Sequence, residues 1–128
     1  MATILIIDDE SGIRYIAKQV LSQNCSGRTA LIEAATGQEG LRLLGEYRPE
    51  LVLLDYRLPD MDGNEWLTRA QAICRTAVLL ISASSEIEKI AHNQDMVIGS
   101  LAKPFKLSKL TFMVCDALSR ALPGEVSP

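Results

Sequence analysis

Short apolar runs of strand length alternate along this 128-residue chain with segments whose apolar residues recur at helical spacing. Such alternation is typical of strand–helix–strand units that build a parallel sheet. A chain of this length fits one ordinary domain and is too short for two independent cores. We therefore expect one α/β domain, with strands at Thr3 to Ile7, Thr29 to Ala34, Leu51 to Leu54, Ala77 to Ile81 and Val97 to Ala102.

Five helices are expected to cover the two faces of this sheet. The second begins near Thr36 and Gly37, the third near Asn64, and the segment Ser84 to Asn93 has few apolar residues and predicts a short helix. Two stripes at helical spacing mark the first and last helices: Ile13, Ile16, Ala17, Val20 and Leu21, and then Leu107, Leu110, Val114, Ala117, Leu118 and Ala121. The pattern ends at Pro123, so we assign a domain to residues 1–122 and a tail or linker to residues 123–128.

Composition and charge exclude several classes of protein. The net charge is -3 and no cluster of lysine and arginine is present, so direct binding to nucleic acid is not expected. No apolar run approaches the roughly 20 residues that span a bilayer, and the first residues carry no basic leader, so we expect no membrane association and a cytoplasmic location. The three widely spaced cysteines suggest neither a disulfide framework nor a metal site.

Three acids stand at the ends of two predicted strands. Asp8 and Asp9 follow the first strand, and Asp55 follows the third. In a doubly wound sheet of order 2-1-3-4-5 these strands are neighbours, and ligands gather at their carboxyl ends. Carboxylates held close together repel unless a cation joins them, and Mg²⁺ prefers such oxygen ligands. Taken alone, the Asp8–Asp9 pair is also typical of a helix cap, and Asp55 is typical of a turn residue. The three acids at two neighbouring strand ends together favour a metal site.

A hydroxyl and an ammonium end two further strands. Ser82 follows the fourth strand and Lys103 the fifth, so both are expected at the edge that holds the acids. Taken alone, Ser82 could be a strand-end cap and Lys103 a solvated side chain. Beside the acids, Lys103 can pair with Asp55 or with a phosphate, and a cis bond at Pro104 could aim Lys103 inward. Together these groups predict a phosphoryl site.

With these motifs in place, the chain resembles the receiver domain of two-component response regulators over nearly its whole length. The resemblance implies a flavodoxin-like, doubly wound sheet of five parallel strands with five helices. Four segments carry it, in the order expected: Ile-Leu-Ile-Ile-Asp8-Asp9-Glu, Leu-Val-Leu-Leu-Asp55-Tyr-Arg-Leu-Pro59-Asp-Met-Asp-Gly63, Leu-Leu-Ile-Ser82-Ala83 and Lys103-Pro104-Phe105.

The resemblance also implies a chemistry for the site. Asp55 would take a phosphoryl group from the phosphohistidine of a sensor histidine kinase or phosphotransfer protein. Asp8, Asp9, Asp55 and the backbone carbonyl of Arg57 would hold Mg²⁺. Apart from its own phosphorylation and slow dephosphorylation, no turnover is expected, so the chain is not interpreted as an enzyme.

The phosphoryl group itself would be bound by Lys103, the Ser82 hydroxyl and the Ala83 amide. A shift of the loop after the fourth strand would then change the face formed by the fourth helix, the fifth strand and the last helix. A downstream output protein or domain would contact this face. The chain departs from the family at Ser100, where most receivers have Tyr or Phe, and its spacing from Ser82 to Lys103 is about one residue shorter.

Two alternatives belong to other classes of protein. A degenerate receiver would act as an interaction domain without phosphorylation; Ser100 leaves this open, whereas the intact set of acids, hydroxyl and lysine argues against it. A cofactor enzyme of the flavodoxin type is disfavoured because the loop after the first strand is acidic where a phosphate cradle needs glycines and free amides. No Gly-x-x-x-x-Gly-Lys run exists, which excludes a P-loop nucleotidase.

Overall fold

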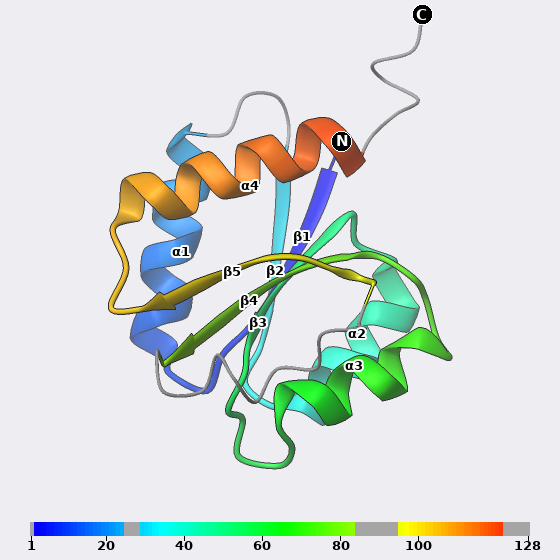
Figure 1. Ribbon diagram of the computed structural model, residues 1–128. Helices are drawn as coiled ribbons and strands as arrows, with labels where there is room; N and C mark the ends of the chain where they lie inside the picture. Colours follow the sequence, from blue (N-terminus) through cyan, green and yellow to red (C-terminus); the bar gives the residue numbers. More distant parts are fainter. Residues whose placement is uncertain (1, 25–28, 84–94, 122–128) are drawn as a thin grey trace, which may run out of the picture.

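Five parallel strands form one sheet in the order β2-β1-β3-β4-β5, the doubly wound order predicted from the sequence (Figure 1). The computed structural model describes residues 2–24, 29–83 and 95–121. The strands are β1 (Ala2–Ile7), β2 (Thr29–Ala34), β3 (Leu51–Asp55), β4 (Ala77–Ala83) and β5 (Val97–Lys103). Because β1 lies between β2 and β3, the chain reverses its direction of winding at β1, and this reversal creates the site described below.

Four helices are described, two on each face of the sheet: α1 (Ser11–Asn24), α2 (Gly37–Tyr47), α3 (Gly63–Gln71) and α4 (Leu107–Ala121). Helices α1 and α4 pack on one face, and α2 and α3 pack on the other (Figure 1). The expected starts of α2 and α3 are confirmed to within one residue. The fifth predicted helix, at Ser84 to Asn93, lies outside the described residues. Within the described ranges, no helix is long and apolar enough to cross a bilayer.

Alternate residues of each central strand face the two helical layers, so these strands read as continuous apolar runs. In β1, Leu5 and Ile7 pack with the α2–α3 layer, whereas Ile4 and Ile6 pack with the α1–α4 layer. The indole of Trp66, from α3, is fully buried and donates a hydrogen bond to the Gly37 carbonyl at 3.2 Å. The two cores therefore hold the strands and helices in one fixed register.

The buried stripes of the first and last helices were predicted with two errors. Ala17 and Leu21 in α1 are buried, as expected, but Ile16 is 43% exposed, and Leu107 at the start of α4 is 44% exposed. Consecutive helical residues point about 100° apart, so a helix that faces the sheet through Ala17 turns Ile16 away from it. Both exposed side chains line a groove between α1 and α4, described with the site.

Strands β3, β4 and β5 extend one or two residues beyond their predicted ends. Parallel pairing continues through Asp55 opposite Ile81 and through Ala83 opposite Lys103. Asp55, Ala83 and Lys103 are thus the last members of their strands and not the first members of loops. Their backbones are held by the sheet ladder, which orients their side chains more firmly than a loop would.

The loop between β3 and α3 is fastened to the start of α2. Asp60 accepts hydrogen bonds from the amides of Gly37 at 2.8 Å and Gln38 at 2.9 Å, and Thr36 accepts one from the amide of Glu39. These bonds satisfy the free amides of the first helical turn. Although burial alone would raise the pKa of Asp60, the amides of Gln38 and Gly37 lower it. The loop that follows the candidate phosphoacceptor is therefore anchored.

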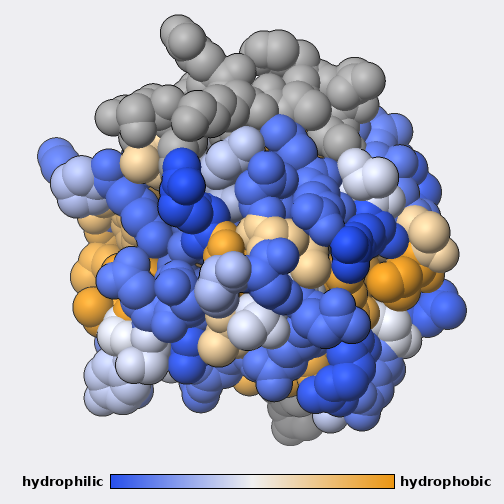
Figure 2. All heavy atoms as spheres, turned by 90° about the horizontal axis from the view of Figure 1, so that it is seen from below, coloured by the Kyte–Doolittle hydropathy of each residue, from blue (hydrophilic) through white to orange (hydrophobic). Residues whose placement is uncertain are grey.

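Large apolar side chains reach the surface at a few positions. The most exposed are Tyr15, Ile16, Tyr47, Ile73, Ile98, Leu107 and Phe112. Seen from below the view of Figure 1, the molecule is mostly hydrophilic, with apolar side chains gathered in small patches (Figure 2). Two of the exposed residues, Ile98 on β5 and Phe112 on α4, line the same shallow pocket.

Candidate functional site

An open cleft lies at the carboxyl ends of β1, β3, β4 and β5. It is lined by Asp9, Glu10, Asp55, Arg57, Leu58, Pro59, Ala83 and Lys103. The topology alone brings these residues together, because parallel strands end at the same edge and β1 and β3 are neighbours. Five of the seven residues predicted for the site line this cleft: Asp9, Asp55, Arg57, Ala83 and Lys103.

Lys103 joins the buried carboxylates at the floor of the site. Its Nζ lies 3.4 Å from Oδ2 of Asp55 and 3.3 Å from Oδ2 of Asp8, and 3.7 Å from Oε1 of Glu10. Asp8 and Asp55 are only 2% and 6% exposed. Carboxylates buried this deeply need a counter-charge, and Lys103 supplies one to both. The predicted pairing of Lys103 with Asp55 is confirmed.

Burial and like charge change the acidity of these groups. Burial, and after it the charge of Asp8, raise the pKa of Asp55 to about 6, although Lys103 opposes the rise. Burial also raises the pKa of Asp8, against the hydrogen bond from the Glu10 amide and the charge of Lys103. Burial disfavours the ammonium of Lys103, but the charges of Asp8 and Asp55 outweigh that cost and its pKa is raised. The site therefore carries an excess of poorly solvated negative charge.

The acidic turn after β1 has the donor set of a hard-cation site. One carboxylate oxygen from each of Asp8, Asp9 and Glu10 can be chosen so that all lie within 4.8 Å of one another. Such oxygens, partly buried and in excess of nearby cations, fit Mg²⁺. Glu10 was not predicted as part of this group. Its position directly after two acids was the available signal.

Ser82 and Ala83 occupy different environments at the end of β4. Ala83 is exposed and lines the cleft. Ser82 is fully buried and does not line the cleft, and its Oγ has no hydrogen-bond partner within the described part of the chain. A buried hydroxyl without a partner costs about 1–3 kcal/mol, so this group is one that a ligand or a local shift would satisfy. The role predicted for Ser82 stays a prediction.

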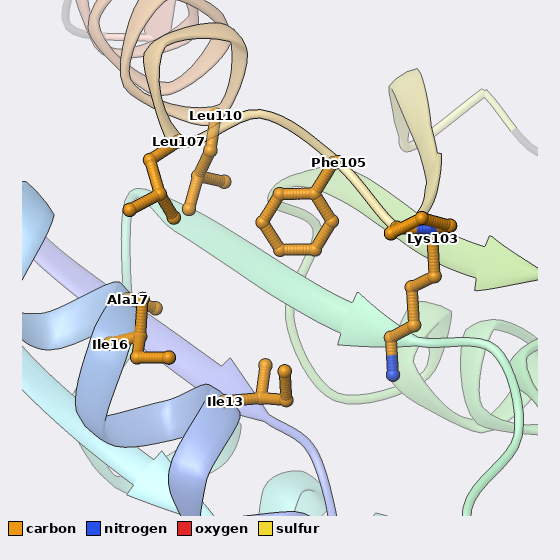
Figure 3. Close-up of a pocket in the computed structure, with 8 residues that line it drawn as sticks. Ile13, Ile16, Ala17, Lys103, Phe105, Leu107 and Leu110 are labelled. Carbon is orange, nitrogen blue, oxygen red and sulfur yellow. The ribbon is translucent and has the colours of Figure 1, made fainter.

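The peptide bond between Lys103 and Pro104 is cis, as the sequence suggested. Directly beyond it, an apolar groove of about 420 Å³ separates α1 from α4. Phe105 projects into this groove from the connection between β5 and α4, opposite Ile13 and Ile16 of α1 (Figure 3). The amine of Lys103 points away from the Phe105 ring and contacts Asp8 and Asp55. Lys103 thus borders both the acidic cleft and the apolar groove.

Comparison with known protein families assigns the chain to a family. Residues 4–114 match the family model described as response regulator receiver domain. The chain belongs to the response regulator receiver family. It is a receiver domain of a two-component system, with the acidic cluster typical of the receiver Mg²⁺ site.

The receiver resembles both a protein of its own length and parts of longer ones. It is 33% identical to Sporulation initiation phosphotransferase F of Bacillus subtilis over 122 residues, which cover 94% of this chain and 93% of that protein. It is 33% identical to the KDP operon transcriptional regulatory protein KdpE of Escherichia coli, covering 94% of this chain and 52% of that protein. The receiver thus spans about half the length of several relatives, including 48% of the probable C4-dicarboxylate response regulator DctR of Priestia megaterium.

Solved structures share the receiver's architecture. A CheY-like response regulator receiver domain from Methanospirillum hungatei has a TM-score of 0.84 at 25% identity, covering 97% of this chain and 98% of that chain. A receiver domain protein from Clostridium thermocellum has a TM-score of 0.82 at 26% identity, covering 94% and 96%. The fold is therefore that of the family along essentially the whole receiver.

Proposed function

We propose that this receiver accepts a phosphoryl group on Asp55 from a phosphohistidine of a sensor histidine kinase or phosphotransfer protein. The observation that carries the proposal is the pairing of the buried Asp55 carboxylate with Lys103 at 3.4 Å, beside the acidic turn. A poorly solvated carboxylate is a ready nucleophile, and an adjacent cation can neutralise the charge of the incoming group. Similarity to a protein named as a phosphotransferase supports the same chemistry.

In the proposed transfer, a carboxylate oxygen of Asp55 attacks phosphorus. A P–O bond forms while the P–N bond to the donor imidazole breaks, and the bonding electron pair stays on the imidazole nitrogen. A pKa of about 6 leaves Asp55 ionised at neutral pH, so the attack needs no general base. Lys103 then exchanges its contact with Asp55 for the phosphoryl oxygens.

We propose Mg²⁺ as the cofactor, held by Asp8, Asp9, Asp55 and the backbone carbonyl of Arg57. The donor set of the acidic turn fits a hard divalent cation, and the site has more negative than positive charge. When bound, Mg²⁺ neutralises charge on the transferring phosphoryl group. The protein keeps Asp8 in place for this role through Lys103 and through the amide of Glu10, which donates to Oδ1 of Asp8 at 2.9 Å.

The proposed response to phosphorylation begins at Ser82. Its buried Oγ lacks a partner in the described residues, and a phosphoryl oxygen on Asp55 would supply one, together with the Ala83 amide. The end of β4 would move toward Asp55, and the adjoining face of β5 and α4 would carry the change to an output protein or domain. Ser100 is exposed on β5 and has no ring to reorient, so we propose that backbone movement transmits the signal.

The apolar groove is proposed as the docking surface for the phosphodonor. It adjoins the acidic cleft at Lys103, and Ile16 and Leu107 are nearly half exposed along it. A donor that brings a histidine to Asp55 must cover the adjacent surface, and an amphipathic helix from the donor would bury these side chains. This assigns the donor, and not the output protein, to the α1 side of the molecule.

Intact-protein mass after incubation with acetyl phosphate tests the central proposal. The wild-type protein is compared with Asp55→Asn, with and without Mg²⁺. Asp95→Asn is the matched control, because Asp95 precedes β5 and lies at the opposite, amino-terminal end of the sheet, paired with Arg75. We expect a Mg²⁺-dependent gain of one phosphoryl group in the wild type and Asp95→Asn, and none in Asp55→Asn.

Labelling of Asp55→Asn would refute the assignment of the phosphoacceptor. If neither acetyl phosphate nor a phosphohistidine protein labels the wild type, the receiver is better explained as an interaction domain that works without phosphorylation. Ser100, in place of the usual aromatic residue, is the observation that favours this second function.

A further inference from the structure

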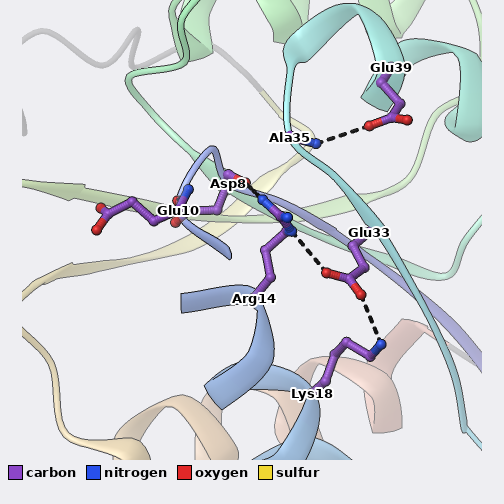
Figure 4. A network of polar contacts seen from close by, with 7 residues as sticks. All are labelled: Asp8, Glu10, Arg14, Lys18, Glu33, Ala35 and Glu39. Carbon is purple, nitrogen blue, oxygen red and sulfur yellow. Dashed lines mark hydrogen bonds and ion pairs between the residues drawn. The ribbon is translucent and has the colours of Figure 1, made fainter. Parts of the chain in front are cut away.

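Arg14 connects the acidic turn after β1 to the neighbouring edge strand, β2 (Figure 4). Its Nη1 donates to the backbone carbonyl of Asp8 at 2.6 Å, and its Nε donates to Oε1 of Glu33 at 2.8 Å. Glu33 is on β2, and its other oxygen accepts a hydrogen bond from Nζ of Lys18 at 2.8 Å. The function proposed above uses none of these three side chains.

The network is ordered because each member is held by its neighbours. Glu33 receives two cations, and the hydrogen bonds from Lys18 and Arg14 lower its pKa. The Arg14 side chain is only 17% exposed, against 40% for Lys18. A guanidinium presents its donors in a rigid plane, so two acceptors, one in the turn after β1 and one on β2, fix its position. Lys18 touches Glu33 in the same way but has no contact with the acidic turn that the structure records.

The carbonyl that Arg14 grips belongs to the peptide between Asp8 and Asp9. Fixing this oxygen fixes the plane of that peptide, and with it the direction in which the Asp9 side chain leaves the backbone. Other bonds hold the same turn: the Asp8 amide donates to the Ala34 carbonyl at 3.1 Å, and the Glu10 amide donates to Oδ1 of Asp8. Arg14 is the side chain that ties this turn to α1.

We infer that Arg14, held in place by Glu33, is a positioning residue for the divalent-cation site, because it presets the carboxylates of Asp8 and Asp9. This inference rests on the proposed Mg²⁺ site. A positioning role and a purely electrostatic role of Arg14 predict opposite changes in cation affinity. If Arg14 acted only as a nearby positive charge, its removal would strengthen binding of a cation; if it positions the ligands, its removal weakens binding.

The test measures Mg²⁺ binding to the metal-free protein by titration calorimetry and backbone amide exchange in the same metal-free protein. The variants are Arg14→Gln, Arg14→Lys, Glu33→Gln and, as the matched control, Lys18→Gln. Lys18→Gln also removes one positive charge and one hydrogen bond to Glu33, yet it leaves the contact with Asp8 intact.

We expect the dissociation constant for Mg²⁺ to rise about tenfold in Arg14→Gln, as for other residues that orient metal ligands, and to change less than about twofold in Lys18→Gln. The dissociation constants of Arg14→Lys and Glu33→Gln should lie between these two values. Each variant keeps the positive charge on residue 14 but loses the paired contacts that fix its side chain to both Asp8 and Glu33. The amide of Glu10 should exchange faster in Arg14→Gln without metal, and at the wild-type rate in Lys18→Gln.

Unchanged or tighter Mg²⁺ binding in Arg14→Gln would overturn the inference, and so would an equal loss in Lys18→Gln. Failure of the wild-type protein to bind Mg²⁺ would instead refute the metal site of the proposed function, and the inference with it. The two failures are therefore distinguishable in one set of titrations.

Discussion

Replacing Asp55, the proposed phosphoacceptor, should stabilise the protein. Folding buries the Asp55 carboxylate beside Asp8 and raises its pKa from 3.8 to about 6. The folded protein binds the proton of Asp55 more tightly than the unfolded chain does, so protonation of Asp55 stabilises the folded state. This stabilisation is complete below pH 3.8 and is lost as the pH rises through about 6. At 1.36 kcal/mol per pH unit, the cost at pH 7.5 is about 3 kcal/mol.

Asp55→Asn removes this charge with little change in shape. Burying the amide of Asn has a smaller cost, so we expect the free energy of unfolding at pH 7.5 to rise by about 2 kcal/mol. The gain in unfolding free energy over the wild type should be larger at pH 7.5 than at pH 5, by about 1 kcal/mol. Urea unfolding without metal, followed by circular dichroism at both values of pH, measures both quantities.

Two controls test whether the buried charge of Asp55 causes the difference in stability. Asp95→Asn changes an exposed carboxylate, 69% accessible and paired with Arg75, and should alter stability by less than about 0.5 kcal/mol at either pH. Mg²⁺ at about 100 times its dissociation constant should stabilise the wild type by about 2.7 kcal/mol, which is enough to close the gap. An Asp55→Asn protein no more stable than wild type at pH 7.5, or a gap that does not change with pH, would refute the electrostatic account of the site.

Other perturbations follow from particular contacts. Lys103→Ala should still take phosphate from acetyl phosphate, as seen by mass, but the amide exchange of β4 and β5 should then no longer change on phosphorylation; a normal change would contradict the role of Lys103. Ile16→Asp should slow phosphoryl transfer from a phosphohistidine protein at least about tenfold, because it removes apolar contact worth about 1.4 kcal/mol. Labelling by acetyl phosphate should be unaffected. The control Ile73→Asp changes a side chain of similar exposure outside the groove and should slow neither reaction. Asp60→Ala should lower the free energy of unfolding by about 1 kcal/mol, because it frees two amides of α2; a neutral effect in urea unfolding would show that the loop is not anchored there. Leu44→Ala, at a fully buried position, should cost about 2–5 kcal/mol in the same assay, and a cost below 1 kcal/mol would mean that the α2 core is loosely packed.

Much of the site could be predicted from the sequence because its residues end predicted strands. The ends of parallel strands meet at one edge, so the positions of Asp8, Asp55 and Lys103 in the chain sufficed to bring them together. The predicted strand ends were one or two residues short, since pairing with a neighbour extends a strand beyond its apolar run. Ser82 lies at the end of β4, as predicted, but the sequence did not indicate that it is fully buried.

The sequence by itself determined the α/β class and the acidic site, because hydrophobic period and strand-end residues are local properties of the chain. Its resemblance to receiver domains supplied the family and the strand order. Only the tertiary structure decided which side chains of different elements touch. Arg14 and Glu33 are 19 residues apart and meet because β2 lies beside β1 under α1. The exposure of Ile16 likewise depends on how α1 is turned against the sheet, a choice made by the packing of two cores and not by the period of one helix.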